Sequence, residues 1–540
     1  MQLTVLLVGA LALGAGLPTP QASDAPLTPR ERAVHLLSRF SFGHRPGDVA
    51  RVLEIGEEAW IEEQLERGPV GPAALSKALA RLETLEMTPS QVQRHVELEL
   101  PADATREQRA ERNRRRAVPK HELMAAVLLR AVYADRQLEE VMCDFWRNHF
   151  NVSYTKTYPA ELYITEYERV VIQEHALGEF PAMLSASAHH PAMMHYLDNH
   201  LSTRPPSSSQ LAEIERRVRQ ETGSKERGEE AAAIAAQRGL NENYARELLE
   251  LHTLGVDRTY RQKDVVAVAE ALTGWGISQQ RGRGLGFYFD PNRHIEGDKK
   301  FLGYVLRRDK SGGPGQGERI LEILCRHNDT ADFIATKLVR YLVHDEPPAG
   351  LVKEVAQVFK KTEGDVRALV GEILESDEFW ERENYRAKFK TPHEFLMSAL
   401  RATGAQVTDM GGVLKALHAM GQPVYHCDDP TGWYDTADAW LDPGVMAKRW
   451  EVALLLAANK LEGVEIPASF YGEISEEVTP LRWMRGMVDK VLPGGASTRT
   501  LAMLHEVVRE HTDKGDRPDL RKLGPEVLGL LLGSPEFQEQ

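Results

Sequence analysis

The sequence predicts a mostly α-helical protein with a small β-hairpin near residues 284–306. Apolar residues recur at helical spacing along most of the chain. Two capping boxes with proline at the first helical position, Thr28–Glu31 and Thr391–Glu394, mark helix starts. The alternation that is typical of a strand is convincing only near residues 285–289. With 540 residues, of which 42% are hydrophobic, the chain can bury a large core in two or three subdomains.

In chain order, the first expected helix begins at the Thr28 capping box and ends near Phe40. After the strand at 285–289, the Asp290-Pro-Asn sequence turns the chain toward a second apolar run at 301–305. Amphipathic patterns predict the other helices over residues 136–151, 159–176, 180–188, 191–201, 238–255, 262–273, 317–326, 330–343, 350–361, 365–375, 391–404, 440–460, 480–491, 498–511 and 519–533.

The composition divides the chain after residue 23 into four regions. We expect an N-terminal helical region at 24–201, a flexible insertion at 202–237, a central helical region with the hairpin at 238–385, and a C-terminal helical region at 386–540. The insertion lacks large apolar residues after Val218, so it cannot bury much apolar surface. It is interpreted as a surface insertion or a flexible linker, partly helical at most.

The amino terminus indicates export. Residues 1–23 carry no charge, and an apolar run from Leu3 to Leu17 is followed by proline and small residues. This pattern predicts a secretory signal peptide that is cleaved near Ala22 or Ser23. The run is too short for a comfortable membrane span. We therefore expect a periplasmic or secreted protein without an integral membrane anchor.

Charge and cysteine content exclude several classes. A formal net charge of −14 argues against a general nucleic-acid binder. The one basic run, residues 106–120, is interpreted as a solvated loop or helix face. Three widely spaced cysteines, Cys143, Cys325 and Cys427, exclude a disulfide framework and a cysteine-rich zinc site.

Two predicted helices place polar side chains within an apolar face. In the helix at 238–255, Asn241 and His252 fall in the middle of the apolar arc, and Glu247 borders it. In the helix before Asn151, His149 holds the same position beside Asn148. Such residues could form a functional wall, or they could be core residues whose polar groups are satisfied by nearby backbone.

The remaining candidates lie on a loop and on an exposed helix face. His294 follows the turn at 290–292 with carboxylates close behind, so it could act as a general base or a metal ligand. Arg246, between Glu242 and Glu250, could form an i,i+4 ladder of ion pairs, or an anion clamp if that face lines a cleft.

Together, His149, His252 and His294 with one carboxylate would make a possible divalent-metal site. Glu247 and Asp198 are the candidate carboxylates. Such a set would suit zinc, iron or copper and would leave an open position for water.

Sequence blocks along nearly the whole chain resemble a bacterial family known as domain of unknown function 1800. The matching blocks are His35–Arg39 with Phe42-Gly43, Asp144–Phe150, Tyr196–Asn199, Gly239–Asp257, Thr273–Trp275, Arg386–Gly404, Gly421–Pro423, Pro430–Gly432, Ala439–Leu441 and Ser534–Phe537. The resemblance implies an exported, mostly helical bacterial protein that is often encoded beside an exported sulfatase-like or alkaline-phosphatase-like protein. It implies no reaction. The histidine cluster at 189–200 looks individual to this chain.

Two hypotheses about function follow. The first is an exported enzyme or ligand-processing protein with a polar pocket, whose candidate catalytic residues are His149, Asn148, Asn241, Arg246, Glu247, His252 and His294. The second is a non-catalytic helical scaffold or partner of a neighbouring exported sulfatase-like or phosphatase-like protein. A shared pocket for the three histidines favours the first hypothesis, and dispersed, individually satisfied histidines favour the second.

Overall fold

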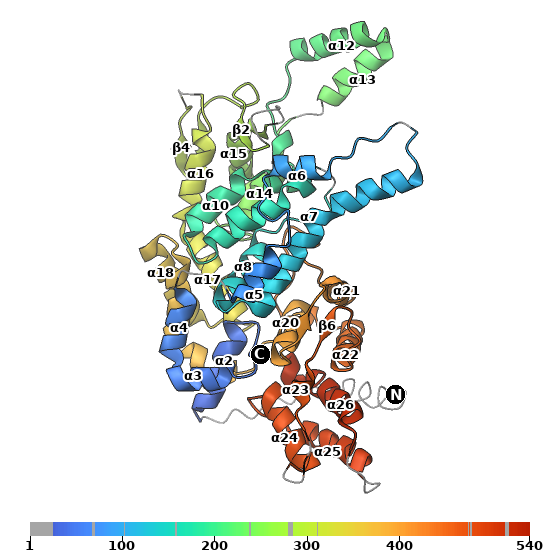
Figure 1. Ribbon diagram of the computed structural model, residues 1–540. Helices are drawn as coiled ribbons and strands as arrows, with labels where there is room; N and C mark the ends of the chain where they lie inside the picture. Colours follow the sequence, from blue (N-terminus) through green and yellow to red (C-terminus); the bar gives the residue numbers. More distant parts are fainter. Residues whose placement is uncertain are drawn as a thin grey trace.

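The computed structural model describes residues 25–66, 71–101, 103–156, 159–236, 239–278, 285–309, 312–473, 475, 478–512 and 518–540. The predicted signal peptide at 1–23 lies outside these residues. The described chain is mostly helical, with three two-stranded antiparallel sheets, which confirms the predicted fold class (Figure 1). No described helix is both long and apolar enough to cross a membrane. The three cysteines are buried and unpaired.

The helices follow one another along the chain with short connections. The first half contains α2 Pro29–Arg39, α3 Asp48–Ile55, α4 Glu57–Leu65, α5 Ala73–Leu79, α6 Pro89–Val96, α7 Arg106–Tyr133, α8 Gln137–His149, α9 Ile164–Tyr167, α10 Phe180–His189, α11 Pro191–Tyr196, α12 Ser208–Thr222, α13 Lys225–Ala236, α14 Asn243–Glu250 and α15 Gln262–Leu272. The second half contains α16 Gly315–Cys325, α17 Asn328–Leu342, α18 Ala349–Thr362, α19 Val366–Glu375, α20 Pro392–Ala402, α21 Gly411–Ala419, α22 Pro443–Ala457, α23 Ala468–Tyr471, α24 Pro480–Val491, α25 Thr498–Thr512, α26 Leu520–Leu532 and α27 Pro535–Gln538.

The expected hairpin near 284–306 is two separate hairpins. Strand β2, Phe287–Phe289, pairs with β1, Trp275–Ile277, which precedes the predicted strand region. Strands β3, Lys299–Phe301, and β4, Tyr304–Leu306, pair with each other. The turn between β3 and β4 has positive φ at both Leu302 (46°) and Gly303 (83°), the geometry of a two-residue hairpin turn. A third sheet joins β5, Gln406–Val407, to β6, Val464–Glu465.

Helix α14 is shorter than the predicted helix at 238–255. The Asn241 side chain accepts a hydrogen bond from the Asn243 backbone N–H at 2.9 Å, so it forms a turn before the helix begins. At the other end, Leu251 and His252 both donate their backbone N–H to the carbonyl of Glu247, and the helix has already ended. Asn241 and His252 therefore flank the helix, and the prediction that they lie within it is wrong.

The predicted insertion at 202–237 contains a helical hairpin, α12 and α13, which projects from the body (Figure 1). Every residue of α12 is described, and none is buried. The two ends of the insertion meet at its base, where the Thr203 backbone N–H donates to the Gly239 carbonyl at 3.1 Å. The long helix α7 projects as well, because its buried residues begin only at Pro119.

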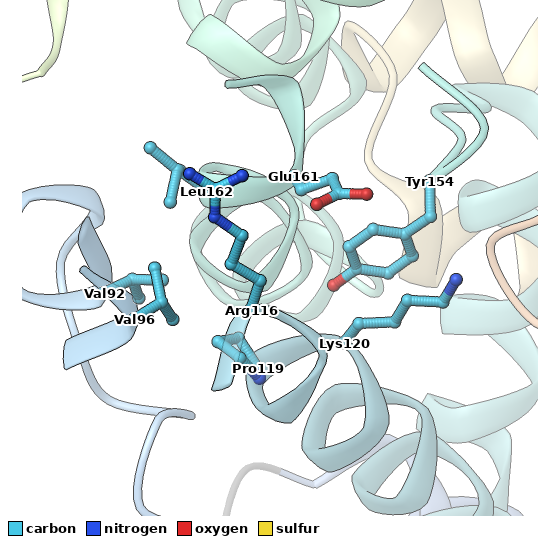
Figure 2. A pocket seen from close by; sticks show the side chains of 8 residues that line it. All are labelled: Val92, Val96, Arg116, Pro119, Lys120, Tyr154, Glu161 and Leu162. Carbon is cyan, nitrogen blue, oxygen red and sulfur yellow. The ribbon is translucent and has the colours of Figure 1, made fainter. Parts of the chain in front are cut away.

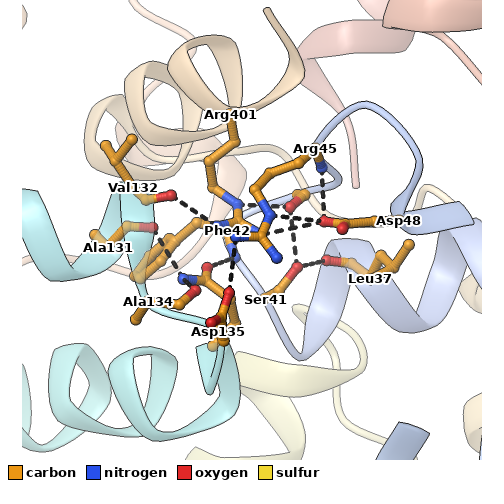
Figure 3. A network of polar contacts seen from close by, with 12 residues as sticks. Leu37, Ser41, Phe42, Arg45, Asp48, Ala131, Val132, Ala134, Asp135 and Arg401 are labelled. Atoms are coloured by element: carbon orange, nitrogen blue, oxygen red, sulfur yellow. Dashed lines mark hydrogen bonds and ion pairs between the residues drawn. The ribbon is translucent and has the colours of Figure 1, made fainter. Parts of the chain in front are cut away.

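Buried polar groups join the N-terminal segment to elements far along the sequence. Arg401 of α20 is 2% exposed; its guanidinium donates to the carbonyl of Gly43 at 2.8 Å and to that of Val132 at 2.9 Å (Figure 3). In α2, His35 donates to the Phe379 carbonyl at 2.9 Å, and Arg39 donates to the carbonyls of Val343 and Asn384. The core therefore closes only when both ends of the chain are present.

Candidate functional site

The C-terminal end of α8 holds the loop at 427–433 against the body. Asn148 donates to the Trp433 carbonyl at 2.8 Å and accepts from the Trp433 backbone N–H at 2.7 Å. Between these bonds, Gly432 has φ of +80°, and a Cβ there would overlap the Asn148 side chain and carbonyl. Only glycine fits this close approach without strain. Asn148 is thus a residue that fixes a loop.

Asn151 holds the same loop from the residue that follows α8. Its amide donates to the carbonyls of Cys427 (3.2 Å) and Asp429 (2.8 Å) and to the Tyr196 hydroxyl (3.1 Å). The Tyr196 hydroxyl in turn donates to the Asp428 carbonyl at 2.9 Å. Sequence reasoning did not select Asn151, although it lies within three residues of the selected Asn148.

His149 and His252 lie next to each other, as predicted. Their ring centroids are 6.2 Å apart, and His149 Nε2 donates to the backbone carbonyl of His252 at 3.2 Å. Burial lowers the pKa of His252 to about 3 and the pKa of His149 well below its ordinary value, and the nearby Lys337 ammonium lowers both further. Both rings are therefore neutral at neutral pH. Among the described residues, His149 Nδ1 has no hydrogen-bond partner.

A buried ion network runs along the opposite side of α8. Arg147 forms a bidentate pair with Glu168, with Nε–Oε2 and Nη2–Oε1 distances of 3.1 and 2.9 Å, and a further bond of 3.1 Å with Asp144. The Tyr425 hydroxyl donates to the same Glu168 carboxylate. Glu168 begins a π-helical turn, Glu168–Gln173, and such turns are frequent at functional sites. The sequence indicated only that Arg147 lies off the apolar face.

Glu247 and Arg246 of α14 have different environments. Burial raises the pKa of the half-buried Glu247, and the neighbouring carboxylates of Glu250 and Asp429 raise it further. Glu247 therefore lies close to the loop that Asn148 and Asn151 hold. Arg246 is on an exposed face and forms the expected ladder, 3.7 Å from Glu242 and 3.3 Å from Glu250.

His294 and Asp198 have partners away from the two histidines. His294 donates from Nδ1 to the Thr273 carbonyl at 2.7 Å, and its Nε2 lies 3.1 Å from Gln316 Oε1. Asp198 forms an exposed ion pair with Lys156 at 3.2 Å. No contact joins His294 to His149 or His252, and the described residues contain no group of three or more histidine, cysteine or carboxylate side chains that could hold a metal ion. The metal hypothesis thus gains no ligand set from the structure.

The histidines at 189–200 also have separate surroundings. His189 lies 2.7 Å from a carboxylate oxygen of Glu318 and stacks on Trp275, with ring centroids 4.5 Å apart. His195 and His200 lie beside each other, with centroids 4.2 Å apart.

A large groove separates the α12–α13 hairpin from the body. Its volume is about 1230 Å³. Asn241 lies in its wall and donates to the Asp198 carbonyl at 2.9 Å. The Arg293 guanidinium fixes another part of the wall by donating to the carbonyls of His200 (2.6 Å) and Ser202 (3.1 Å). The groove is lined by His200, Leu201, Thr203, Arg204, Pro206, Gln210, Ile214, Ala235, Gly239, Leu240, Asn241, Glu242, Ile277, Asn292 and Arg293. Sequence reasoning identified the insertion but not this groove.

The predicted site residues thus separate into three places. Asn148, His149, His252 and Glu247 surround the end of α8, Asn241 lines the groove, and His294 lies with Thr273 and Gln316. Comparison with curated proteins and with solved structures gave no match. The profile of a family described as "Protein of unknown function (DUF1800)" matches residues 35–539, nearly the whole chain. The chain therefore belongs to this family, as its sequence blocks predict.

Proposed function

We propose that the protein is a non-catalytic helical scaffold that holds a segment of a partner protein in the groove beneath the α12–α13 hairpin. The size of the groove carries this proposal. Its volume of about 1230 Å³ exceeds the roughly 300–1,000 Å³ that is usual for small-molecule pockets. An extended polypeptide segment fits a groove of this size and open shape better than a metabolite does.

The chemistry of the groove also suits a polypeptide. Leu201, which is 59% exposed, lies in it with Ile214 and Ile277 and offers apolar contact surface. Arg204 and Asn241 add polar groups that can bond backbone carbonyls or side chains. Recognition of extended segments combines such apolar contacts with hydrogen bonds to the main chain.

The α12–α13 hairpin is suited to adapt to a bound segment. Because α12 buries none of its residues, the hairpin is held to the body mainly at its base. Few buried contacts mean a low free energy of local displacement, so the hairpin can adjust to a partner at small cost.

The arrangement of the histidines supports a scaffold over an enzyme. His294 bonds Thr273 and Gln316, and His149 bonds the backbone of His252, so most of the polar groups that suggested a shared pocket are satisfied locally. The remaining pair lacks the third ligand or acidic partner that a histidine-based reaction centre requires.

We further propose that the protein is exported and that its partner is an exported sulfatase-like or phosphatase-like protein. The uncharged, apolar residues 1–23 support export. The partner rests on the family resemblance alone.

The test compares two isoleucine substitutions on the same hairpin. Ile214→Glu places a charge in the groove, whereas Ile234→Glu places it at a position that is 54% exposed and outside the groove lining. Binding of a separately produced phosphatase-like protein from the same organism is measured by biolayer interferometry. We expect Ile214→Glu to weaken binding about 10-fold or more, because a charge would replace buried apolar contact. Ile234→Glu should bind like the unmodified protein.

Two results would overturn the proposal. The first is the absence of binding by the unmodified protein. The second is equal binding by both variants, which would show that the partner does not use the groove.

A further inference from the structure

A second candidate binding site lies at the base of the projecting part of α7, away from the groove. Residues of α6, α7, and the segment after α8 surround a small pocket (Figure 2). One part of the lining is apolar, and the other contains two cationic side chains, one carboxylate and one phenol. The lining residues are Val92, Val96, Arg116, Pro119, Lys120, Tyr154, Glu161 and Leu162.

The polar groups of this pocket lack partners among the described residues. Tyr154 is only 4% exposed, yet its hydroxyl makes no hydrogen bond, and the nearby Thr165 hydroxyl does not reach hydrogen-bond geometry with it. The Lys120 ammonium has neither a hydrogen bond nor an ion pair; it lies 5.5 Å from the centroid of the Tyr154 ring. Figure 2 shows the Tyr154 hydroxyl pointing into the space between Glu161 and α7. A buried hydroxyl without a partner is uncommon and calls for a ligand or water.

The ionisation of Tyr154 fixes what it can bind. Burial raises the pKa of Tyr154 far above neutrality, so its hydroxyl keeps its proton and can donate a hydrogen bond. With the Lys120 ammonium and the Arg116 guanidinium beside it, the pocket offers three donor groups to an acceptor. A carboxylate oxygen is the acceptor that such a set matches best.

The size of the pocket limits the ligand to one terminal group. Its volume is about 10 Å³, on a scale where one water molecule needs roughly 10–15 Å³. One carboxylate oxygen can fill this space while the second lies at the mouth. The rest of the ligand must lie on the surface outside.

That outer surface is strongly basic. The exposed residues 106–116 of α7, here called the basic half of α7, contain six arginines and two glutamates, a formal charge of +4 in a chain of net charge −14. Glu111 pairs with Arg114 at 2.7 Å and with Arg115 at 3.4 Å. Charge of one sign on a projecting helix attracts ligands of the opposite sign.

We infer that this surface binds an acidic polypeptide segment that lies along the basic half of α7 and inserts one aspartate or glutamate side chain into the pocket. The Tyr154 hydroxyl and the Lys120 ammonium receive the carboxylate. Glu161, at the rim, accepts a backbone N–H of the segment. The inference is independent of the proposed groove, since neither Tyr154 nor Lys120 lines it.

The probe is a fluorescein-labelled decapeptide of alternating glutamate and glycine, amidated at its C-terminus, with binding to the full chain measured by fluorescence anisotropy. We expect Lys120→Gln to weaken binding about 10-fold and Tyr154→Phe to weaken it about 5-fold. Tyr154→Phe should leave the Tm unchanged, because the hydroxyl has no protein partner to lose. Added NaCl should weaken binding by screening the exposed arginines.

Matched controls are Tyr288→Phe and Lys353→Gln, which change an exposed tyrosine and an exposed lysine outside the pocket. Three results would overturn the inference. The first is no binding at about 1 mM peptide. The second is binding by Tyr154→Phe and Lys120→Gln equal to that of the controls, which would leave only nonspecific attraction to arginine. The third is tighter binding of an uncharged peptide with a free C-terminal carboxylate, which would identify a different ligand.

Discussion

Replacing Glu168 by alanine should lower the free energy of unfolding by about 4 kcal/mol. The side chain of Glu168 is 2% exposed, and that of its partner Arg147 is 9% exposed. The carboxylate accepts two hydrogen bonds from Arg147, one from Tyr425 and one from Gln173 at 3.2 Å. Its removal leaves a buried guanidinium and a buried hydroxyl without their main acceptor.

The magnitude follows from what remains. Removing one partner of a buried ion pair costs about 3–5 kcal/mol. Arg147 keeps its 3.1 Å bond to Asp144, so we take the lower limit, about 3 kcal/mol. The Tyr425 hydroxyl, which loses its acceptor, adds about 1 kcal/mol.

Urea unfolding followed by circular dichroism measures this difference. The double variant Arg147→Met with Glu168→Leu is the informative control, because apolar residues of similar volume remove both charges together. It should lose less stability than Glu168→Ala alone. A loss below about 1 kcal/mol for Glu168→Ala, the value typical of an exposed pair, would refute the reasoning.

The same network should make stability depend on acid. Burial alone would raise the pKa of Glu168, but the charge of Arg147 and the hydrogen bonds from Arg147 and Tyr425 outweigh burial and lower it. A carboxyl whose pKa is lower in the folded state stabilises the protein above its unfolded pKa, about 4.3. This contribution should be lost as the pH falls below that value, and Glu168→Ala should show a smaller loss over the same range.

Four further predictions can be checked separately. Burial raises the pKa of Glu140 to about 7, so Glu140→Gln should stabilise the protein at pH 8, by up to about 3 kcal/mol relative to pH 4; equal effects at both pH values would contradict this. Gly432→Ala should lower the Tm and loosen the loop at 427–433, because the added methyl overlaps α8; an unchanged Tm would show that the loop yields easily. Limited proteolysis should cut first within 202–237 while the remainder stays folded, and resistance of this stretch would show that it is packed. Intact mass of the exported protein should place its first residue near Ser23 or Asp24, and retention of Met1 would count against a signal peptide.

Local signals predicted the helices well, because their cause is local. The Thr28 and Thr391 capping boxes are formed as the sequence indicates, and the helices that follow them end where expected. The strand at Phe287–Phe289 was also visible from alternation, but its partner was not, since alternation states which face is buried and not which strand lies beside it. Helix α14 was overextended because the Asn241 side chain competes with the helix for backbone hydrogen bonds.

The candidate site was predictable only in part for the same reason. Periodicity identified His149 as a buried polar residue at the end of α8, and His252 lies beside it. It could not place His294, whose neighbours Thr273 and Gln316 depend on how the β1–β2 hairpin packs against α16. The loop at 427–433 is joined to Asn148 across 285 residues of sequence, and no local pattern indicates such a contact.

The contacts of α2 with the second half of the chain determine when the protein can fold during synthesis. His35 and Arg39 find their buried partners at Val343, Phe379 and Asn384, and the segment that follows α2 awaits Arg401. A ribosome that adds about 5–20 residues per second needs roughly 20–70 s to reach that arginine after α2 has emerged. During that time the first helix has no core to join, so the amino-terminal part stays in a non-native state. An unfolded leading segment is what passage through a membrane channel requires, and the long-range closure of this fold would supply it without a separate device.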